Sequence, residues 1–126
     1  MQKVYDNVDS SVSIPFVGNT TLSEDMAFPV DGIVYYIGAK GIPFTEGIAS
    51  EAVIGAIPHS VVLLRMADNA DIKSAMQTIK SNVNSMKWIC VGIPKEEIIV
   101  DNIGSIVILI ISNDGPAIHE AFKKLA

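Results

Sequence analysis

The chain has 126 residues with a formal net charge of −5, and 49% of its residues are hydrophobic while 18% are charged. This composition excludes a disordered chain, and the length predicts one domain with a core of its own. Because acidic residues outnumber basic ones and no basic stripe is present, we exclude nucleic acid as a partner. The apolar runs are far shorter than the roughly 20 residues that a membrane-spanning helix needs.

The start of the chain differs from the rest in being polar. Residues 1–23 are rich in Ser, Thr, Asn and Asp, and they predict an N-terminal arm or linker ahead of a single domain over residues 24–126. No basic start followed by an apolar run marks a signal peptide. We therefore expect either a cytoplasmic protein or one whose export signal has been removed.

Glycine and proline recur between residues 24 and 59, so short elements are expected there. Helical spacing of apolar residues over 33–37 predicts a short helix, with Asp31 as its N-cap. An extended segment is expected near residues 52–57. Residues 60–66 are β-branched and leucine-rich, which predicts a buried strand.

The next predicted element is a helix over residues 69–83. Asp68 is expected to be its N-cap, with Asp71 three positions later near the positive end of the helix. Five apolar residues recur at the spacing of one helical face and predict its buried side: Ile72, Ala75, Met76, Ile79 and Val83.

The last third of the chain predicts extended segments and a hairpin. A short extended segment is expected at residues 87–91 and a strand at 97–103. Gly104 can adopt the positive φ that a tight hairpin requires. In residues 105–112, both sets of alternating positions carry apolar side chains. Both faces of a strand here would thus be apolar, which predicts a central strand covered on both faces.

A final helix is expected to begin at Asn113 or Asp114 and to contain a Glu120–Lys124 pair. Its inward-facing residues should be Ile118, Ala121, Phe122 and Leu125. The order of elements predicts an α+β fold: a small, mainly antiparallel sheet with helices on one face and a polar N-terminal arm. The strand over 98–103 is expected at a sheet edge, where it either pairs in a homodimer or is covered by the arm.

Three stretches together resemble a known group of proteins. They are IPHSVVLLR at 57–65, NVNSMKWICV at 82–91, and IIVDNIGSIVILI at 98–110. Together they resemble an uncharacterised domain of small envelope lipoproteins in Gram-positive, often gut-dwelling, bacteria, over about residues 28–126. The resemblance implies export, a lipid-bearing cysteine upstream of residue 1 and a non-catalytic, extracytoplasmic domain that reaches the membrane only through this lipid. It supplies no catalytic or binding residue.

Cys90 is the one cysteine, so neither an intrachain disulfide nor a cysteine-based zinc cage is possible within the chain. A thiol nucleophile would need a base, and His59 is a candidate. The alternative is that Cys90 is a shielded apolar residue beside Trp88, because positions 88 and 90 share one face of an extended segment. His119 could join these two residues at a zinc ion, but no spacing forces the three together. We therefore expect no catalytic, metal or cofactor site.

Tyr35, Tyr36 and Trp88 are the candidate contacts for a ligand or partner, since aromatic rings can stack on a sugar or a peptide. A pocket lined by them with several polar groups would favour a small ligand, and a flat apolar patch a protein partner.

The first hypothesis for the function is a non-catalytic extracytoplasmic domain that binds an unknown protein or small molecule at the cell surface. An intracellular regulatory domain with a ferredoxin-like βαββαβ plan is the alternative, and a thiol hydrolase using Cys90 and His59 is the third.

Overall fold

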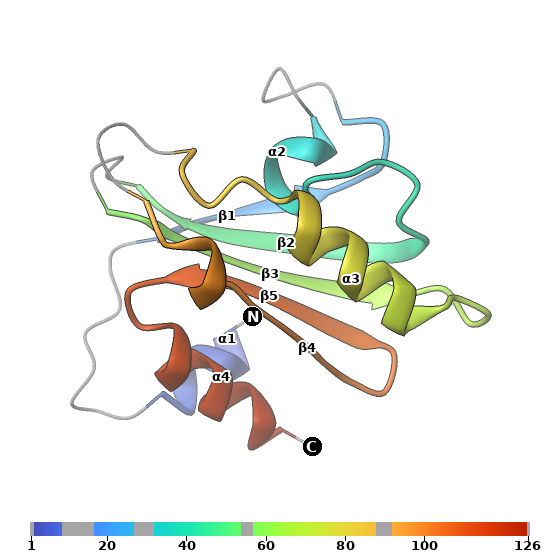
Figure 1. The fold of residues 1–126 in the computed structure, drawn as a ribbon. Helices are drawn as coiled ribbons and strands as arrows, with labels where there is room; N and C mark the ends of the chain where they lie inside the picture. Colours follow the sequence, from blue (N-terminus) through green and yellow to red (C-terminus); the bar gives the residue numbers. More distant parts are fainter. Residues whose placement is uncertain (1, 9–16, 27–31, 54–56, 88–91, 126) are drawn as a thin grey trace.

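The computed structural model describes residues 2–8, 17–26, 32–53, 57–87 and 92–125. Five strands form one antiparallel sheet in the order β1-β2-β3-β5-β4. This confirms the α+β class and the antiparallel sheet expected from the sequence. The elements in chain order are α1 (Gln2–Asp6), β1 (Val17–Leu22), α2 (Ile33–Ile37), β2 (Phe44–Ala52), β3 (His59–Met66), α3 (Ile72–Asn82), the 3₁₀ turn η1 (Lys95–Glu97), β4 (Ile99–Ile103), β5 (Ile106–Ser112) and α4 (Gly115–Lys123) (Figure 1).

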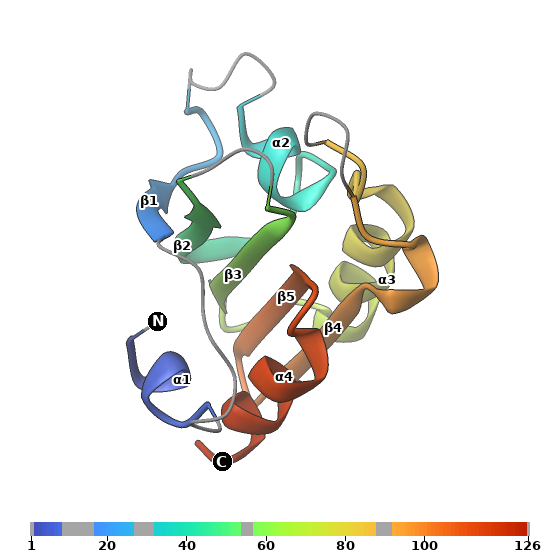
Figure 2. The ribbon, with the colours of Figure 1, turned by 90° about the vertical axis from the view of Figure 1, so that its left-hand side faces the viewer.

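Helices cover both faces of the sheet, so the expectation of helices on one face is wrong (Figure 2). α2 and α3 pack on one face, where Val62 and Leu109 belong to the core. α1 and α4 pack on the other face, against Val61 and Ile110. Successive side chains of a strand point to opposite faces, and the apolar residues of β3 and β5 on both sides therefore need two layers of cover. The prediction that residues 105–112 are buried on both faces is confirmed for residues 107–112, whereas Ser105 is exposed and Ile106 is half-buried.

The N-terminal segment does more than form an arm. Residues from Val17 to Leu22 pair with β2 as the edge strand β1, and α1 packs against α4 through the buried Val4. The polar sequence of β1 hid this strand, because Gly, Asn and the exposed Thr residues lack a clear apolar face. β1 lies at the edge opposite β4, so this strand does not cover β4.

β2 is a nine-residue strand where only short elements were expected. Its residues Thr45–Glu51 mix charged, small and apolar side chains, which weakens the alternation that marks a strand. It forms because β1 and β3 pair with it on either side. α2 lies where the helical spacing predicted it, and its expected cap, Asp31, lies outside the described residues.

The ends of two helices differ from the expectation. α3 begins at Ile72, and Asp71 rather than Asp68 is its N-cap, accepting a hydrogen bond from the Ser74 backbone N–H at 3.1 Å. Asp114 precedes α4 as expected. Leu125, expected to face inward, is 40% exposed.

Within α4, Glu120 pairs with Lys123, the residue before the expected Lys124. The β4–β5 hairpin turns at Gly104, which has a φ of +56°, as the sequence predicted. β4 is an edge strand, also as predicted. None of the helices in the described part of the chain has the length and apolar character needed to cross a membrane.

Candidate functional site

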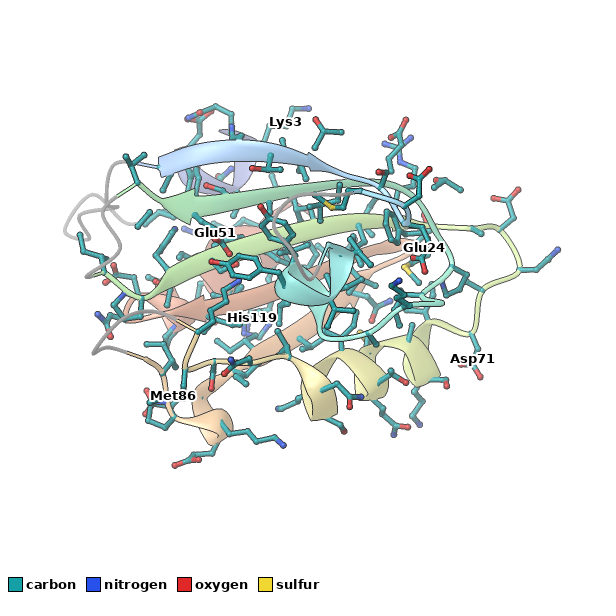
Figure 3. The ribbon with its side chains drawn as sticks, turned by 90° about the horizontal axis from the view of Figure 1, so that it is seen from above. Lys3, Glu24, Glu51, Asp71, Met86 and His119 are labelled. Atoms are coloured by element: carbon teal, nitrogen blue, oxygen red, sulfur yellow. The ribbon has the colours of Figure 1, made fainter. Side chains whose placement is uncertain are left out.

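A pocket of about 260 Å³ opens between α2, the end of α3 and the loop that follows α3. Its lining combines one aromatic ring and one valine with three polar side chains: Val34, Tyr35, Asn82, Asn84 and Lys87. Figure 3 views this face of the sheet, with Glu51 on β2 and Met86 in the loop after α3. The pocket therefore brings together residues that are up to about 50 positions apart in the chain, one of which is the predicted contact Tyr35.

The pocket exists because α2 and α3 meet end to end. Gly38 ends α2 with a φ of +84°, and a Cβ at this position would lie 2.4 Å from the Val83 backbone nitrogen. Only glycine permits both the left-handed conformation and this close approach. Gly38 thereby fixes the C-terminal end of α3 beside Tyr35.

Lys87 is the most buried charged group at the site, since its side chain is only 4% exposed. Its Nζ donates hydrogen bonds to the Glu51 carboxylate at 2.5 Å and to the Tyr35 carbonyl at 3.1 Å. The same ammonium lies 4.0 Å from the centre of the Tyr35 ring and 5.4 Å from that of Tyr36. A carboxylate, a carbonyl and two π faces thus compensate for the water that Lys87 has lost.

The electrostatics of the site follow from this burial. Burial lowers the pKa of Lys87, while the Glu51 carboxylate acts against that shift. Burial together with the negative charge of Glu51 raises the pKa of Tyr35 to about 12. Tyr35 therefore remains a neutral phenol in the physiological pH range.

The two tyrosines have different roles. Their rings meet edge to face with centres 5.0 Å apart, which is a favourable aromatic geometry. Tyr36 is buried in the core beneath α2, so it supports Tyr35 and Lys87 and does not line the pocket. Tyr35 is the residue that a ligand can reach. Trp88, the third predicted contact, lies outside the described residues.

Two asparagines supply the remaining polar groups. Asn82 donates from its Nδ2 to the Thr78 carbonyl at 2.7 Å, and this leaves its Oδ1 as an acceptor for a ligand. Asn84 accepts the Met86 backbone N–H through its Oδ1 at 2.9 Å, and this leaves its Nδ2 as a donor. The pocket thus offers one amide acceptor and one amide donor.

Sequence reasoning singled out Tyr35 but not Glu51, Asn82, Asn84 or Lys87. An available signal was the Asn-Val-Asn stretch at the C-terminal end of the predicted helix, because polar side chains at a helix end often lie beside a cleft. The pairing of Glu51 with Lys87 had no local signal.

His59, the candidate base, lies on the opposite face of the sheet, under α1. Its side chain is fully buried. Nδ1 is 2.8 Å from the Ser112 hydroxyl and Nε2 is 3.0 Å from the Tyr5 hydroxyl, which in turn is 2.6 Å from the Ser50 hydroxyl. Burial lowers the pKa of His59. Nε2 therefore links the sheet to α1, and Nδ1 links β3 to β5. Cys90, the expected partner of His59, lies outside the described residues.

His119, the other histidine, pairs with an acid at the sheet edge. Its Nε2 is 2.7 Å from the Asp101 carboxylate and links α4 to β4, and this contact lowers the pKa of Asp101. In the described ranges, no three His, Cys, Asp or Glu residues are grouped so as to hold a metal ion.

No family model, no curated protein and no solved structure matches this chain. The resemblance to envelope lipoproteins thus stays a prediction.

Proposed function

We propose that this chain is a non-catalytic binding domain that takes a small, uncharged polar ligand in the pocket at Tyr35. The observation that supports this most directly is the convergence of an aromatic ring and two amides on one hollow of about 260 Å³. Aromatic surface with a few placed polar groups is the usual composition of a small-molecule site. A pocket that combines a candidate aromatic residue with several polar groups favours a small ligand over a protein partner.

The charge of the pocket favours an uncharged ligand. The Lys87 ammonium is next to the Glu51 carboxylate, so the two charges largely cancel. The groups left for the ligand are the Asn82 Oδ1, the Asn84 Nδ2 and the neutral Tyr35 ring. A hydroxyl- or amide-bearing molecule can use an acceptor, a donor and a stacking surface together.

The location belongs to the same proposal. The resemblance of residues 82–91 and 98–110 to envelope lipoproteins supports a domain on the outer side of a bacterial membrane, held there by a lipid upstream. Protease digestion of intact cells that express the full-length gene product tests this. Digestion of the domain without lysis is expected, and full protection until lysis would contradict the location.

The ferredoxin-like alternative fits less well. β3, α3, β4 and β5 follow that plan, with β5 between the parallel strands β3 and β4. In that plan both helices share one face of the sheet, whereas α3 and α4 lie on opposite faces here. For the thiol hydrolase, the described residues supply only His59, whose ring nitrogens both contact hydroxyl groups of other residues.

An NMR titration tests the ligand site. The probes are glucose, N-acetylglucosamine and the capped dipeptide N-acetyl-Ala-Ala-amide, which all carry hydroxyl or amide groups without charge. We expect saturable shifts at Tyr35, Asn82 and Asn84 with at least one probe. If all three probes leave these signals unchanged at millimolar concentration, the proposal is wrong.

A matched pair of variants identifies the contact. Asn84→Asp keeps the oxygen that accepts the Met86 N–H but loses the amide donor. We expect binding to weaken about threefold to tenfold, the value of one hydrogen bond. Asn19→Asp, at an exposed position of the remote strand β1, adds the same charge and should leave the affinity unchanged.

A further inference from the structure

A second cavity, of about 190 Å³, lies on the opposite face of the sheet from Tyr35. It is enclosed by α1, by α4 and by strands β3, β4 and β5. All but one of its lining residues are apolar: Val4, Leu63, Ile103, Ile106, Phe122 and Leu125. The exception is Lys3 on α1. We call this cavity the α1–α4 groove.

The groove continues along the sheet. A neighbouring hollow of about 290 Å³ shares Leu63 and Ile106 with it. This hollow ends at the Glu46–Arg65 ion pair, whose nitrogen and oxygen are 3.6 Å apart. Figure 1 shows α1 and α4 beneath one side of the sheet only. The two hollows therefore adjoin each other at Leu63 and Ile106.

The charged residue that lines the α1 end of the groove is basic, although the whole chain is acidic. Lys3 is exposed, and within the described part of the chain its ammonium has no hydrogen bond or ion pair. Lys124 lies next to the lining residue Leu125, and its Nζ is 3.4 Å from the Asn7 carbonyl. The nearby acid Asp6 accepts a hydrogen bond from Gln2, and Glu120 is paired with Lys123. An anionic group at this end would therefore meet the Lys3 ammonium.

We propose that the α1–α4 groove binds a free fatty acid, with its hydrocarbon chain along Leu63 and Ile106 and its carboxylate at Lys3. The shape of the groove favours such a chain over a protein. Its walls come from α1, from α4 and from the sheet, and a flat protein surface cannot reach the floor between them, whereas a linear alkyl chain can. The apolar lining supplies the affinity for the chain, and Lys3 supplies the preference for an anionic end. This site is independent of the pocket at Tyr35.

Titration with decanoate and with decanol below their micelle-forming concentrations tests the site. We expect decanoate to bind at one site per chain, with NMR shifts at Leu63, Ile103 and Ile106. Decanol, which has the same chain without the charge, should bind about threefold to fivefold more weakly, as one exposed ion pair would predict. Lys3→Gln should remove this difference by weakening decanoate alone.

Two control variants make the result specific. Lys73→Gln removes an exposed lysine from α3, on the other face of the sheet, and should change neither affinity. Leu125→Ser removes apolar lining and should weaken both probes about threefold to tenfold, because Leu125 is 40% exposed in the free protein. Val53→Ser, at a position that is 60% exposed and does not line either hollow, should leave the affinity for both probes unchanged.

Several outcomes would overturn the proposal. These are the absence of saturable decanoate binding, shifts confined to other surfaces, and an unchanged preference for decanoate in Lys3→Gln. A dimeric wild type that Leu125→Ser dissociates, as measured by sedimentation, would also overturn it. A second copy of the chain would then cover the groove.

Discussion

Replacement of Lys87 by methionine should destabilise the domain by about 3 kcal/mol. Methionine keeps the unbranched apolar stem but removes the ammonium that contacts Glu51 and the Tyr35 carbonyl. Loss of one partner from a buried ion pair costs about 3–5 kcal/mol, because the other charge stays behind without compensation. The Glu51 side chain is 18% exposed and partly reaches water, so the lower end of that range is expected.

Urea unfolding followed by circular dichroism measures this cost. A loss of 3 kcal/mol should lower the midpoint by roughly 1–3 M at an unchanged slope. The double variant Lys87→Met/Glu51→Gln should lose less than the sum of the two single variants, because no stranded carboxylate is left.

Lys123→Met is the matched control. It breaks the Glu120–Lys123 pair, which has a similar separation of 2.7 Å but is largely exposed, and its stability should stay close to that of the wild type. If Lys87→Met were no less stable than this control, the interpretation of Lys87 and Glu51 as a buried, coupled pair would be refuted.

Two further predictions concern the residues first considered for catalysis. Burial lowers the pKa of His59 below its usual 6.5, so the unfolded chain takes up the proton first, and stability should fall as the pH drops below 6.5. Urea midpoints between pH 7.5 and 5 check this, and a flat profile for the wild type would contradict it. Cys90 should react with a chromogenic disulfide reagent slowly in the native protein and fully in urea, as a shielded thiol does. Rapid stoichiometric labelling of the native protein at neutral pH would instead favour the thiol hydrolase.

The sequence alone determined the elements whose signal is local. Apolar spacing predicted β3, α3 and α4, and the β4–β5 hairpin followed from Gly104 and the apolar run after it. These patterns depend on residues that are only a few positions apart in the sequence, so they can be recognised without knowing the fold. Tyr35 was likewise proposed as a contact from its residue type.

Tertiary structure decided the elements and contacts that depend on distant partners. β1 and β2 are strands because β1 pairs with β2 and β2 pairs with β3, although their own residues alternate poorly. The apolar run of β5 already required cover on both faces, but which helix lies on which face depends on how the connections cross the sheet.

The candidate site shows the same division. Glu51 and Lys87 are 36 positions apart, and His59 meets Tyr5 across 54 positions. Residue type made His59 a candidate base, and its surroundings made it a buried link between α1 and the sheet. Charge and hydrogen-bonding capacity are properties of a residue, whereas burial and partner are properties of the fold, and it is these that determine what Lys87 and His59 do.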